Sequence, residues 1–162
     1  MRHGKAADSG YDVDEHRPLT DEGRARMRRT AKAWAKNEKK EPELWLVSPL
    51  VRAVQTAEIC LDAFGQDGPA EITEALVPDG SIGHAAAIFD RDDVAAIAAV
   101  GHDPLMTALA SHLIGARFPA EFKKGAVLAL DRKDPGKAAR IAWFLEPAKD
   151  DRDARFREDL FD

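Results

Sequence analysis

Apolar residues recur at helical spacing in the stretch 21–37, where Met27, Ala31 and Trp34 fall on one face. Thr20 precedes this stretch as a suitable N-cap residue. Two acidic residues follow it, at the helix end where the backbone dipole favours negative charge. The pattern therefore predicts a helix over residues 21–37.

Two short apolar runs lack the alternation of a half-buried strand. Residues 44–47 read Leu-Trp-Leu-Val, and residues 94–100 are rich in valine, isoleucine and alanine. Such runs are typical of parallel strands that are covered on both faces. The alanines of 94–100 would also suit a helix, but the run is short and Gly101 follows it, so a strand is favoured.

The rest of the chain continues the alternation of helices and strands. Asp103 would cap the last helix, with Pro104 at its first position. The alternation predicts an α/β fold, a three-layer sandwich whose mostly parallel central sheet is flanked by helices and ends in an antiparallel C-terminal hairpin. The expected helices are 50–64, 81–89 and 104–114. The expected strands are 72–76, 126–130 and 141–145, the last two paired around the turn Lys133-Asp134-Pro135-Gly136.

Length and charge narrow the class of protein. A chain of 162 residues fits one domain and a monomer. The formal net charge of −5 argues against a general nucleic-acid binder, which would be basic. No apolar run approaches the ~20 residues that span a bilayer. No signal peptide is visible and Cys60 is the single cysteine, so a cytoplasmic location is expected.

Three polar clusters are expected to share one edge of the sheet. Arg2-His3-Gly4 opens the chain, Ser48-Pro49-Leu50-Val51-Arg52 follows the strand at 44–47, and Gly101-His102-Asp103 follows the strand at 94–100. Ligands of open α/β sheets bind outside the carboxyl ends of the strands. Each cluster alone has a plain reading as a turn, a helix start or a surface arginine. Together they predict one pocket that collects His3, His102, Arg2 and Arg52.

Two histidines and two arginines suit a tetrahedral dianion. The guanidinium fork matches two phosphate oxygens. A neutral imidazole is a competent nucleophile toward phosphorus, and a second, protonated imidazole can hold an oxygen of the group in transfer. Gly4 would let the backbone approach the ligand closely. The residues thus predict phosphoryl transfer at this pocket, with one of the two histidines as the nucleophile.

The same residues resemble the histidine phosphatase superfamily. Arg2-His3-Gly4 matches one signature of that family, Ser48-Pro49-Leu50-Val51-Arg52-Ala53-Val54-Gln55-Thr56-Ala57 resembles its block S-P-x-x-R-A-x-Q-T-A, and Gly101-His102 resembles its third block. Arg17-Pro18-Leu19-Thr20 and the short chain are most similar to the SixA branch of protein phosphohistidine phosphatases.

The resemblance implies a role for each matching residue. His3 would take the phosphoryl group, and Arg2, Arg52 and His102 would bind it. Arg17 would be a further phosphate-binding arginine, and neither a metal nor another cofactor would be needed. We expect the catalytic domain to occupy residues 1–146, with the charged residues 147–162 as a tail that is a solvated helix or loose.

No residue stands out as the general acid. Asp103, Glu74 and Asp79 are candidates, each with an equally good reading as a helix cap or an exposed loop acid. Imidazole is a better leaving group than an alkoxide, so the lack of a clear acid favours phosphohistidine as substrate. The expected partner is a phosphorylated protein, such as a histidine phosphotransfer domain. The alternatives are a small phosphate ester, or a phosphate-binding module without turnover.

The position of His3 raises a difficulty. Only two residues precede it, whereas the family has a short hydrophobic strand there. One expectation is that the chain begins late, with Met1 as the last residue of that strand. Otherwise the sheet would lack a central strand, the protein would be of low stability, and His3 would be poorly fixed.

Overall fold

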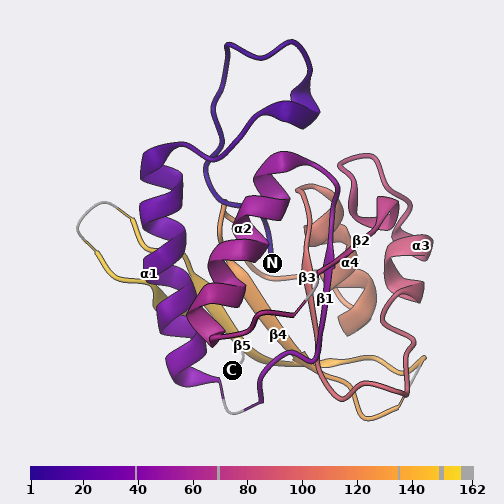
Figure 1. The fold of residues 1–162 in the computed structure, drawn as a ribbon. Coiled ribbons are helices and arrows are strands. Elements are labelled where there is room, and N and C mark those ends of the chain that lie inside the picture. The colour runs from indigo at the N-terminus through magenta and orange to yellow at the C-terminus, as the bar shows by residue number, and fades with distance from the viewer. Residues whose placement is uncertain (39, 69, 135, 150–151, 158–162) are drawn as a thin grey trace.

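The computed structural model describes residues 1–38, 40–68, 70–134, 136–149 and 152–157 (Figure 1). Their elements, in chain order, are the 3-10 helix η1 (Asp14–His16), α1 (Asp21–Asn37), β1 (Leu44–Val47), α2 (Val51–Phe64), β2 (Glu71–Ile72), the 3-10 helix η2 (Glu74–Leu76), α3 (Ile82–Ala87), β3 (Ile97–Val100), α4 (Leu105–Ile114), β4 (Val127–Asp131), β5 (Arg140–Glu146) and β6 (Arg155–Arg157). The predicted α/β fold is confirmed.

The first two helices begin and end as their sequences dictate. The Thr20 hydroxyl accepts a hydrogen bond from the Gly23 amide at 2.9 Å, and so satisfies one of the free donors at the start of α1. Helix α2 ends at Gly65, which has φ +66, a left-handed conformation that glycine adopts without strain. The expected helix 21–37 matches α1, and 50–64 matches α2 to within one residue.

Strand β1 of the parallel sheet is covered on both faces, which gives the fold its layers. The three parallel strands form a sheet in the order β2-β1-β3. Trp45 and Val47 of β1 pack into a core with α1 and α2, whereas Leu44 and Leu46 pack into a second core with α3 and α4. This explains why the run lacks alternation, because each of its side chains has an apolar neighbour.

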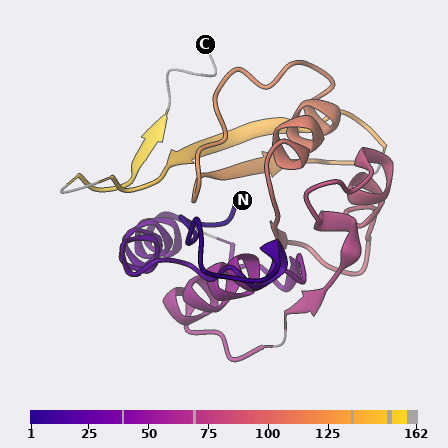
Figure 2. The ribbon, with the colours of Figure 1, turned by 90° about the horizontal axis from the view of Figure 1, so that it is seen from above.

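The N-terminal segment links this sheet to the antiparallel sheet β4-β5-β6. Arg2 forms a parallel bridge with Gly101 just beyond β3, and the Arg2 amide donates to the Ala126 carbonyl oxygen at 3.1 Å. In Figure 2 the N-terminus lies between the purple helices and the orange strands. Met1 is 6% exposed and belongs to the main core. The expectation of a poorly fixed His3 is therefore wrong at this edge of the sheet. The expected gap in the sheet is present, since the described strands form two separate three-stranded sheets and Arg2 contributes an isolated bridge and no strand. The expected low stability stays a prediction.

Away from that edge, the two sheets separate. A groove of about 1050 Å³ lies between them, lined by residues of β3, β4 and β5 and by Met1. The described part of the N-terminal segment therefore connects the sheets only near the carboxyl end of β3.

Several predicted boundaries were wrong. Only Ile72 of the expected strand 72–76 is in β2, because the chain then turns into η2. Strand β3 begins at Ile97, three residues late, and helix α3 is shorter than expected. Pro104 occupies the N-cap position of α4, and no side chain caps that helix end. The Asp103 carboxylate instead accepts a hydrogen bond from the Thr107 hydroxyl.

The described residues after 146 include a strand, where a helix or a loose tail was expected. Residues 155–157 form β6, which pairs with β5 in antiparallel fashion. The Ala148 amide donates to the Thr30 hydroxyl at 3.1 Å, which fixes the start of this region against α1. The division at residue 146 stays a prediction, and Pro135 of the expected turn is outside the described residues. No helix in the described ranges is long and apolar enough to cross a membrane.

Candidate active site

The backbone around His3 fixes its imidazole at the carboxyl end of β3. The His3 amide donates to the Gly101 carbonyl oxygen at 3.0 Å, and the Gly125 amide donates to the His3 carbonyl oxygen at 3.0 Å. His3 Nδ1 lies 2.7 Å from the Gly4 carbonyl oxygen. A carbonyl oxygen only accepts, so Nδ1 carries the hydrogen and Nε2 keeps its lone pair. The unprotonated Nε2 is the nucleophile that phosphoryl transfer requires.

His102 faces His3 across the site. The two rings have centroids 4.8 Å apart, and both side chains are buried. His102 Nε2 lies 2.8 Å from the hydroxyl oxygen of Ser48, which is itself buried. Nδ1 of His102 is buried and has no hydrogen-bond partner among the described residues. A bound ligand could supply the partner that this nitrogen lacks.

Burial and positive charge keep both imidazoles neutral. Desolvation, with smaller effects of His102, Arg52 and Arg2, lowers the pKa of His3 to about 3. Desolvation and then Arg52 lower the pKa of His102 to about 4. Near pH 7 His3 is thus unprotonated and nucleophilic. A bound dianion would favour protonation of His102, because an opposite charge stabilises the imidazolium.

The guanidinium groups of Arg2 and Arg52 supply the positive charge. Arg52 lies in the first turn of α2, and its side chain is 4% exposed. Arg2 Nη1 donates to the Phe122 carbonyl oxygen at 2.9 Å and lies 3.9 Å from an Asp103 carboxylate oxygen. The Nε atoms of both arginines are buried without a hydrogen-bond partner in the described structure. Buried donors of this kind usually have a partner, so these are donors for a ligand.

Asp14 and Arg17 belong to the loop that stands above the body of the molecule, at the top of Figure 1. One Asp14 carboxylate oxygen lies 2.7 Å from Arg52 Nη2, and the other accepts from Arg17 Nε at 2.8 Å and Nη2 at 2.5 Å. The hydrogen bond from Arg52, and then that from Arg17, hold the pKa of Asp14 below its usual range. The loop thus brings an anion to two of the predicted phosphate-binding arginines.

The block 48–57 has a structural reason for each of its polar residues. Ser48 orients His102, and Arg52 points into the site. The Thr56 hydroxyl accepts from the Gly4 amide at 3.1 Å and donates to the Arg52 carbonyl oxygen at 2.7 Å. The Gln55 side-chain oxygen accepts from the Leu19 amide at 2.8 Å and so fixes the base of the loop. Sequence reasoning assigned no role to Ser48, Gln55 or Thr56, although all three lie in the quoted block.

Gly4 is needed for packing beside the site. A Cβ atom on Gly4 would lie 2.6 Å from Met27 Cγ, and one on Gly23 would lie 2.1 Å from the Lys5 carbonyl oxygen. The Gly4 amide already donates a hydrogen bond to the Thr56 hydroxyl. These contacts let α1 approach the segment that carries His3. A direct role of Gly4 in phosphate binding stays a prediction.

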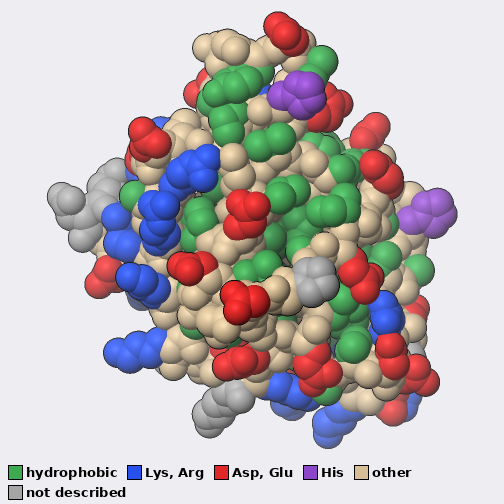
Figure 3. Space-filling model, viewed as in Figure 1, with side chains coloured by type: hydrophobic (Ala, Val, Ile, Leu, Met, Phe, Trp, Pro, Cys, Tyr) green, Lys and Arg blue, Asp and Glu red, His purple; other side chains and the backbone are tan. Residues whose placement is uncertain are grey.

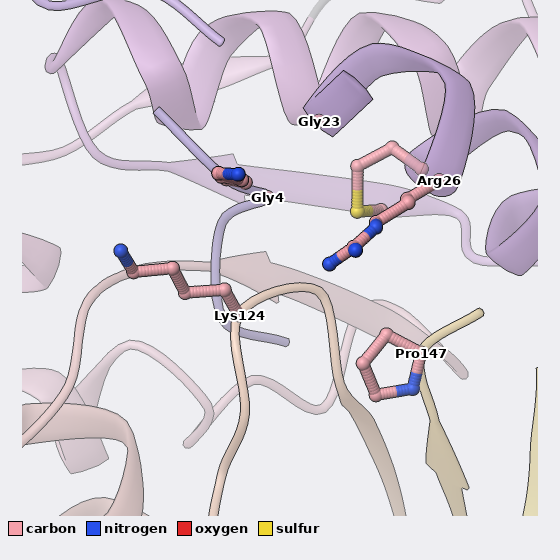
Figure 4. A pocket seen from close by; sticks show the side chains of 7 residues that line it. Gly4, Gly23, Arg26, Lys124 and Pro147 are labelled. Carbon is pink, nitrogen blue, oxygen red and sulfur yellow. The ribbon is translucent and has the colours of Figure 1, made fainter. Parts of the chain in front are cut away.

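A cavity of about 180 Å³ adjoins this packing contact. It is lined by Gly4, Lys5, Gly23, Arg26, Met27, Lys124 and Pro147. Figure 4 shows the Arg26 side chain extending from α1 toward the space between Gly4 and Pro147. Lys5 and Arg26 both form ion pairs with Glu22. The cavity therefore places basic side chains next to the residue that follows His3.

The candidate acids differ in their surroundings. The Asp103 carboxylate lies beside Arg2 and accepts a hydrogen bond from the Thr107 hydroxyl, just before the start of α4. Glu74 and Asp79 are exposed, Glu74 in η2 and Asp79 in the loop after it. Within the described ranges, no group of three or more His, Cys, Asp or Glu residues could hold a metal ion.

Comparison with known proteins adds an independent finding. Residues 1–77 match the family model of the histidine phosphatase superfamily (branch 1). Phosphohistidine phosphatase SixA of Escherichia coli (strain K12) is 33% identical over 150 residues, which are 91% of each chain. An uncharacterized protein of Picosynechococcus sp. is 39% identical over 109 residues, 64% of each chain. The solved structure of the protein histidine phosphatase SixA complexed with tungstate matches with a TM-score of 0.80 and 33% identity, over 89% of this chain and 92% of that one.

Proposed function

The chain belongs to the histidine phosphatase superfamily, and from this premise we propose that it is a phosphatase in which His3 is transiently phosphorylated. One observation carries the proposal. Among the buried side-chain polar atoms without a hydrogen-bond partner in the described structure, three belong to site residues: Arg2 Nε, Arg52 Nε and His102 Nδ1. A bound tetrahedral oxyanion would supply acceptors for such donors. Tungstate, the ligand in the similar SixA structure, is such an oxyanion.

The reaction would proceed in two steps. His3 Nε2 attacks phosphorus, and the bond from phosphorus to the leaving group breaks, so the leaving group takes that electron pair and a proton from solvent. Arg2, Arg52 and a protonated His102 stabilise the charge on the phosphoryl oxygens. Water then attacks phosphorus of the phosphorylated His3, which releases inorganic phosphate and restores the neutral imidazole. The water of this second step returns a proton to solvent. We assign Arg17 to substrate phosphate binding as well.

We further propose that the substrate is phosphohistidine on a protein. The candidate acids support this choice, because Glu74 and Asp79 are exposed and Asp103 is bonded to Thr107. An imidazole leaving group needs less help from an acid than an alkoxide does. The similar protein of Escherichia coli is named a phosphohistidine phosphatase. Such a substrate is consistent with a cytoplasmic enzyme, which stays a prediction.

A basic surface beside the site also favours a protein partner. Helix α1 carries six basic residues but only two acidic ones, in a chain whose formal net charge is −5. Figure 3 shows Lys and Arg side chains gathered on the side of the molecule that α1 occupies. Lys5, Arg26 and Lys124 extend basic character to the cavity next to Gly4. An acidic protein surface would complement this arrangement and steer the encounter.

The test is a comparison of substrates. A phosphorylated histidine phosphotransfer domain and a panel of simple phosphate esters would be offered to the wild-type protein and to Lys124→Glu. We expect the wild-type protein to release phosphate from the protein substrate. Lys124→Glu should lose this activity several-fold and should cleave the esters as well as the wild type does. Efficient cleavage of esters with no action on the phosphoprotein would contradict the proposed substrate.

A small phosphate ester is the second candidate, favoured by one observation. The Asp103 carboxylate lies 3.9 Å from Arg2, near enough to the site to protonate an alkoxide. If this candidate is right, Asp103→Asn will lower ester cleavage by ~10²-fold. If ester cleavage is intact in Asp103→Asn, Asp103 is not the acid.

A further inference from the structure

The Asp14 carboxylate has the contacts expected of a bound anion. It accepts charge-assisted hydrogen bonds from Arg17 at 2.5 and 2.8 Å and lies 2.7 Å from Arg52 Nη2. Both arginines belong to the set assigned above to the substrate phosphate. A carboxylate and a phosphate present similar pairs of oxygens to a guanidinium fork. Asp14 and a phosphoryl group would therefore compete for the same donors.

The loop geometry allows the Asp14 side chain to leave without releasing Arg52. The Asp14 side chain is 53% exposed, whereas that of Arg52 is 4% exposed. The backbone carbonyl oxygen of Asp14 separately accepts from Arg52 Nη1 at 2.8 Å. The base of the loop is fixed by the Ala7 amide, which donates to the Pro18 carbonyl oxygen at 2.9 Å. Rotation of one exposed side chain thus frees Arg52 Nη2 and leaves Arg52 oriented.

The charge of the incoming group decides the outcome of this competition. A monoanion that replaces Asp14 brings to the arginines the same single negative charge that the Asp14 carboxylate already supplies. A dianion places one more negative charge opposite Arg2, Arg17 and Arg52. The additional charge of a dianion strengthens the attraction most where the ion pair is shielded from water, as it is at the buried Arg52.

We propose that Asp14 is a specificity-determining residue, an internal monoanion on Arg17 and Arg52 that a dianionic phosphoryl group displaces and that monoanions do not. The inference rests on the proposed function, because it takes the phosphoryl group to bind these arginines. The inference predicts that Asp14→Asn, the neutral isosteric variant, binds phosphate more tightly than the wild-type protein. If Asp14 only positioned Arg52, its removal would weaken phosphate binding.

The experiment measures the dissociation constants of inorganic phosphate and of formate by calorimetry. It compares the wild-type protein, Asp14→Asn, and the control Glu15→Gln, which removes the same charge from the next residue of the loop. We expect phosphate to bind about tenfold more tightly to Asp14→Asn, since a neutral acceptor competes less well for the guanidinium groups. Formate should bind measurably only to Asp14→Asn. Glu15→Gln should stay within about twofold of the wild type.

Two results would overturn the inference. One is unchanged or weaker phosphate binding in Asp14→Asn. The other is an equal gain in Glu15→Gln, which would reflect net charge alone. Asp14→Ala, which cannot bond Arg52 through its side chain, should show the same direction as Asp14→Asn. The proposed function fails separately, if no phosphoryl group can be trapped on His3 of the wild-type protein.

Discussion

His3, Ser48 and His102 form the floor of the site, whereas Asp14 and Arg17 form its rim. The floor is buried, and backbone and hydroxyl hydrogen bonds fix it at the carboxyl ends of parallel strands. The rim belongs to an exposed loop, and its side chains contact each other and Arg52 through ion pairs. Exposed ion pairs contribute little to stability. We infer that the floor performs the chemistry and the rim selects the ligand.

The largest effect is expected from removal of the nucleophile. His3→Asn should lower kcat by at least ~10³-fold, because it removes the side chain assigned to take the phosphoryl group. Thermal unfolding of the variant should remain cooperative. The measurement is single-turnover release of phosphate. A variant with near wild-type kcat would remove His3 from the floor's chemistry.

The second largest effect is expected in the pH dependence of the free energy of unfolding, which the two histidines of the floor control. His3 and His102 have lowered pKa values in the folded protein, of about 3 and about 4, against an unfolded value of 6.5. Below pH 6.5 the unfolded chain therefore binds more protons than the folded one, and the free energy of unfolding falls as the pH falls. The limiting slope is about 1.4 kcal/mol per pH unit for each histidine. Denaturant titrations between pH 7 and 5 measure this slope.

A histidine variant separates the floor from the rim in that experiment. His102→Asn should reduce the slope by at most about 1.4 kcal/mol per pH unit, since one of the two shifted histidines is then gone. The contribution of Asp14 belongs to more acidic solutions, because its pKa is already lowered and an aspartate loses its charge only there. An unchanged slope in His102→Asn would show that the acid sensitivity arises elsewhere.

Ser48→Ala should have an intermediate effect. It removes the hydroxyl 2.8 Å from His102 Nε2 and leaves a buried nitrogen without its partner. We expect kcat to fall about tenfold with little change in KM, because a hydrogen bond of ~1.4 kcal/mol orients His102 during transfer. Steady-state kinetics with one substrate are sufficient to test this. A change in KM alone would assign Ser48 to binding rather than to the orientation of His102.

The smallest effect is expected at the rim. Arg17→Lys keeps the charge but loses the guanidinium fork that is proposed to bind the substrate phosphate. KM should rise by roughly threefold, and kcat should stay within about twofold. The opposite pattern, with kcat lowered and KM unchanged, would place Arg17 in the chemistry and would remove the distinction between floor and rim.

The sequence revealed the floor more completely than the rim. Apolar runs and quoted motifs predicted β1, β3, α1 and the meeting of His3, Arg52 and His102. Asp14 was missed because it is one of several acids in a polar loop, and only the folded loop brings it to Arg52. The firm placement of His3 was also missed. The segment before it is too short to show periodicity, and the contacts of Arg2 come from distant residues such as Ala126.

The most direct test is to trap the phosphorylated intermediate. Wild-type protein mixed with a phosphorylated histidine phosphotransfer domain would be quenched within milliseconds under alkaline conditions, digested and analysed by mass spectrometry. A phosphoryl group on the peptide that contains His3, absent from His3→Asn, is the predicted result. Phosphate release without any such peptide, or phosphorylation of His102 in its place, would contradict the assignment of His3 as the nucleophile.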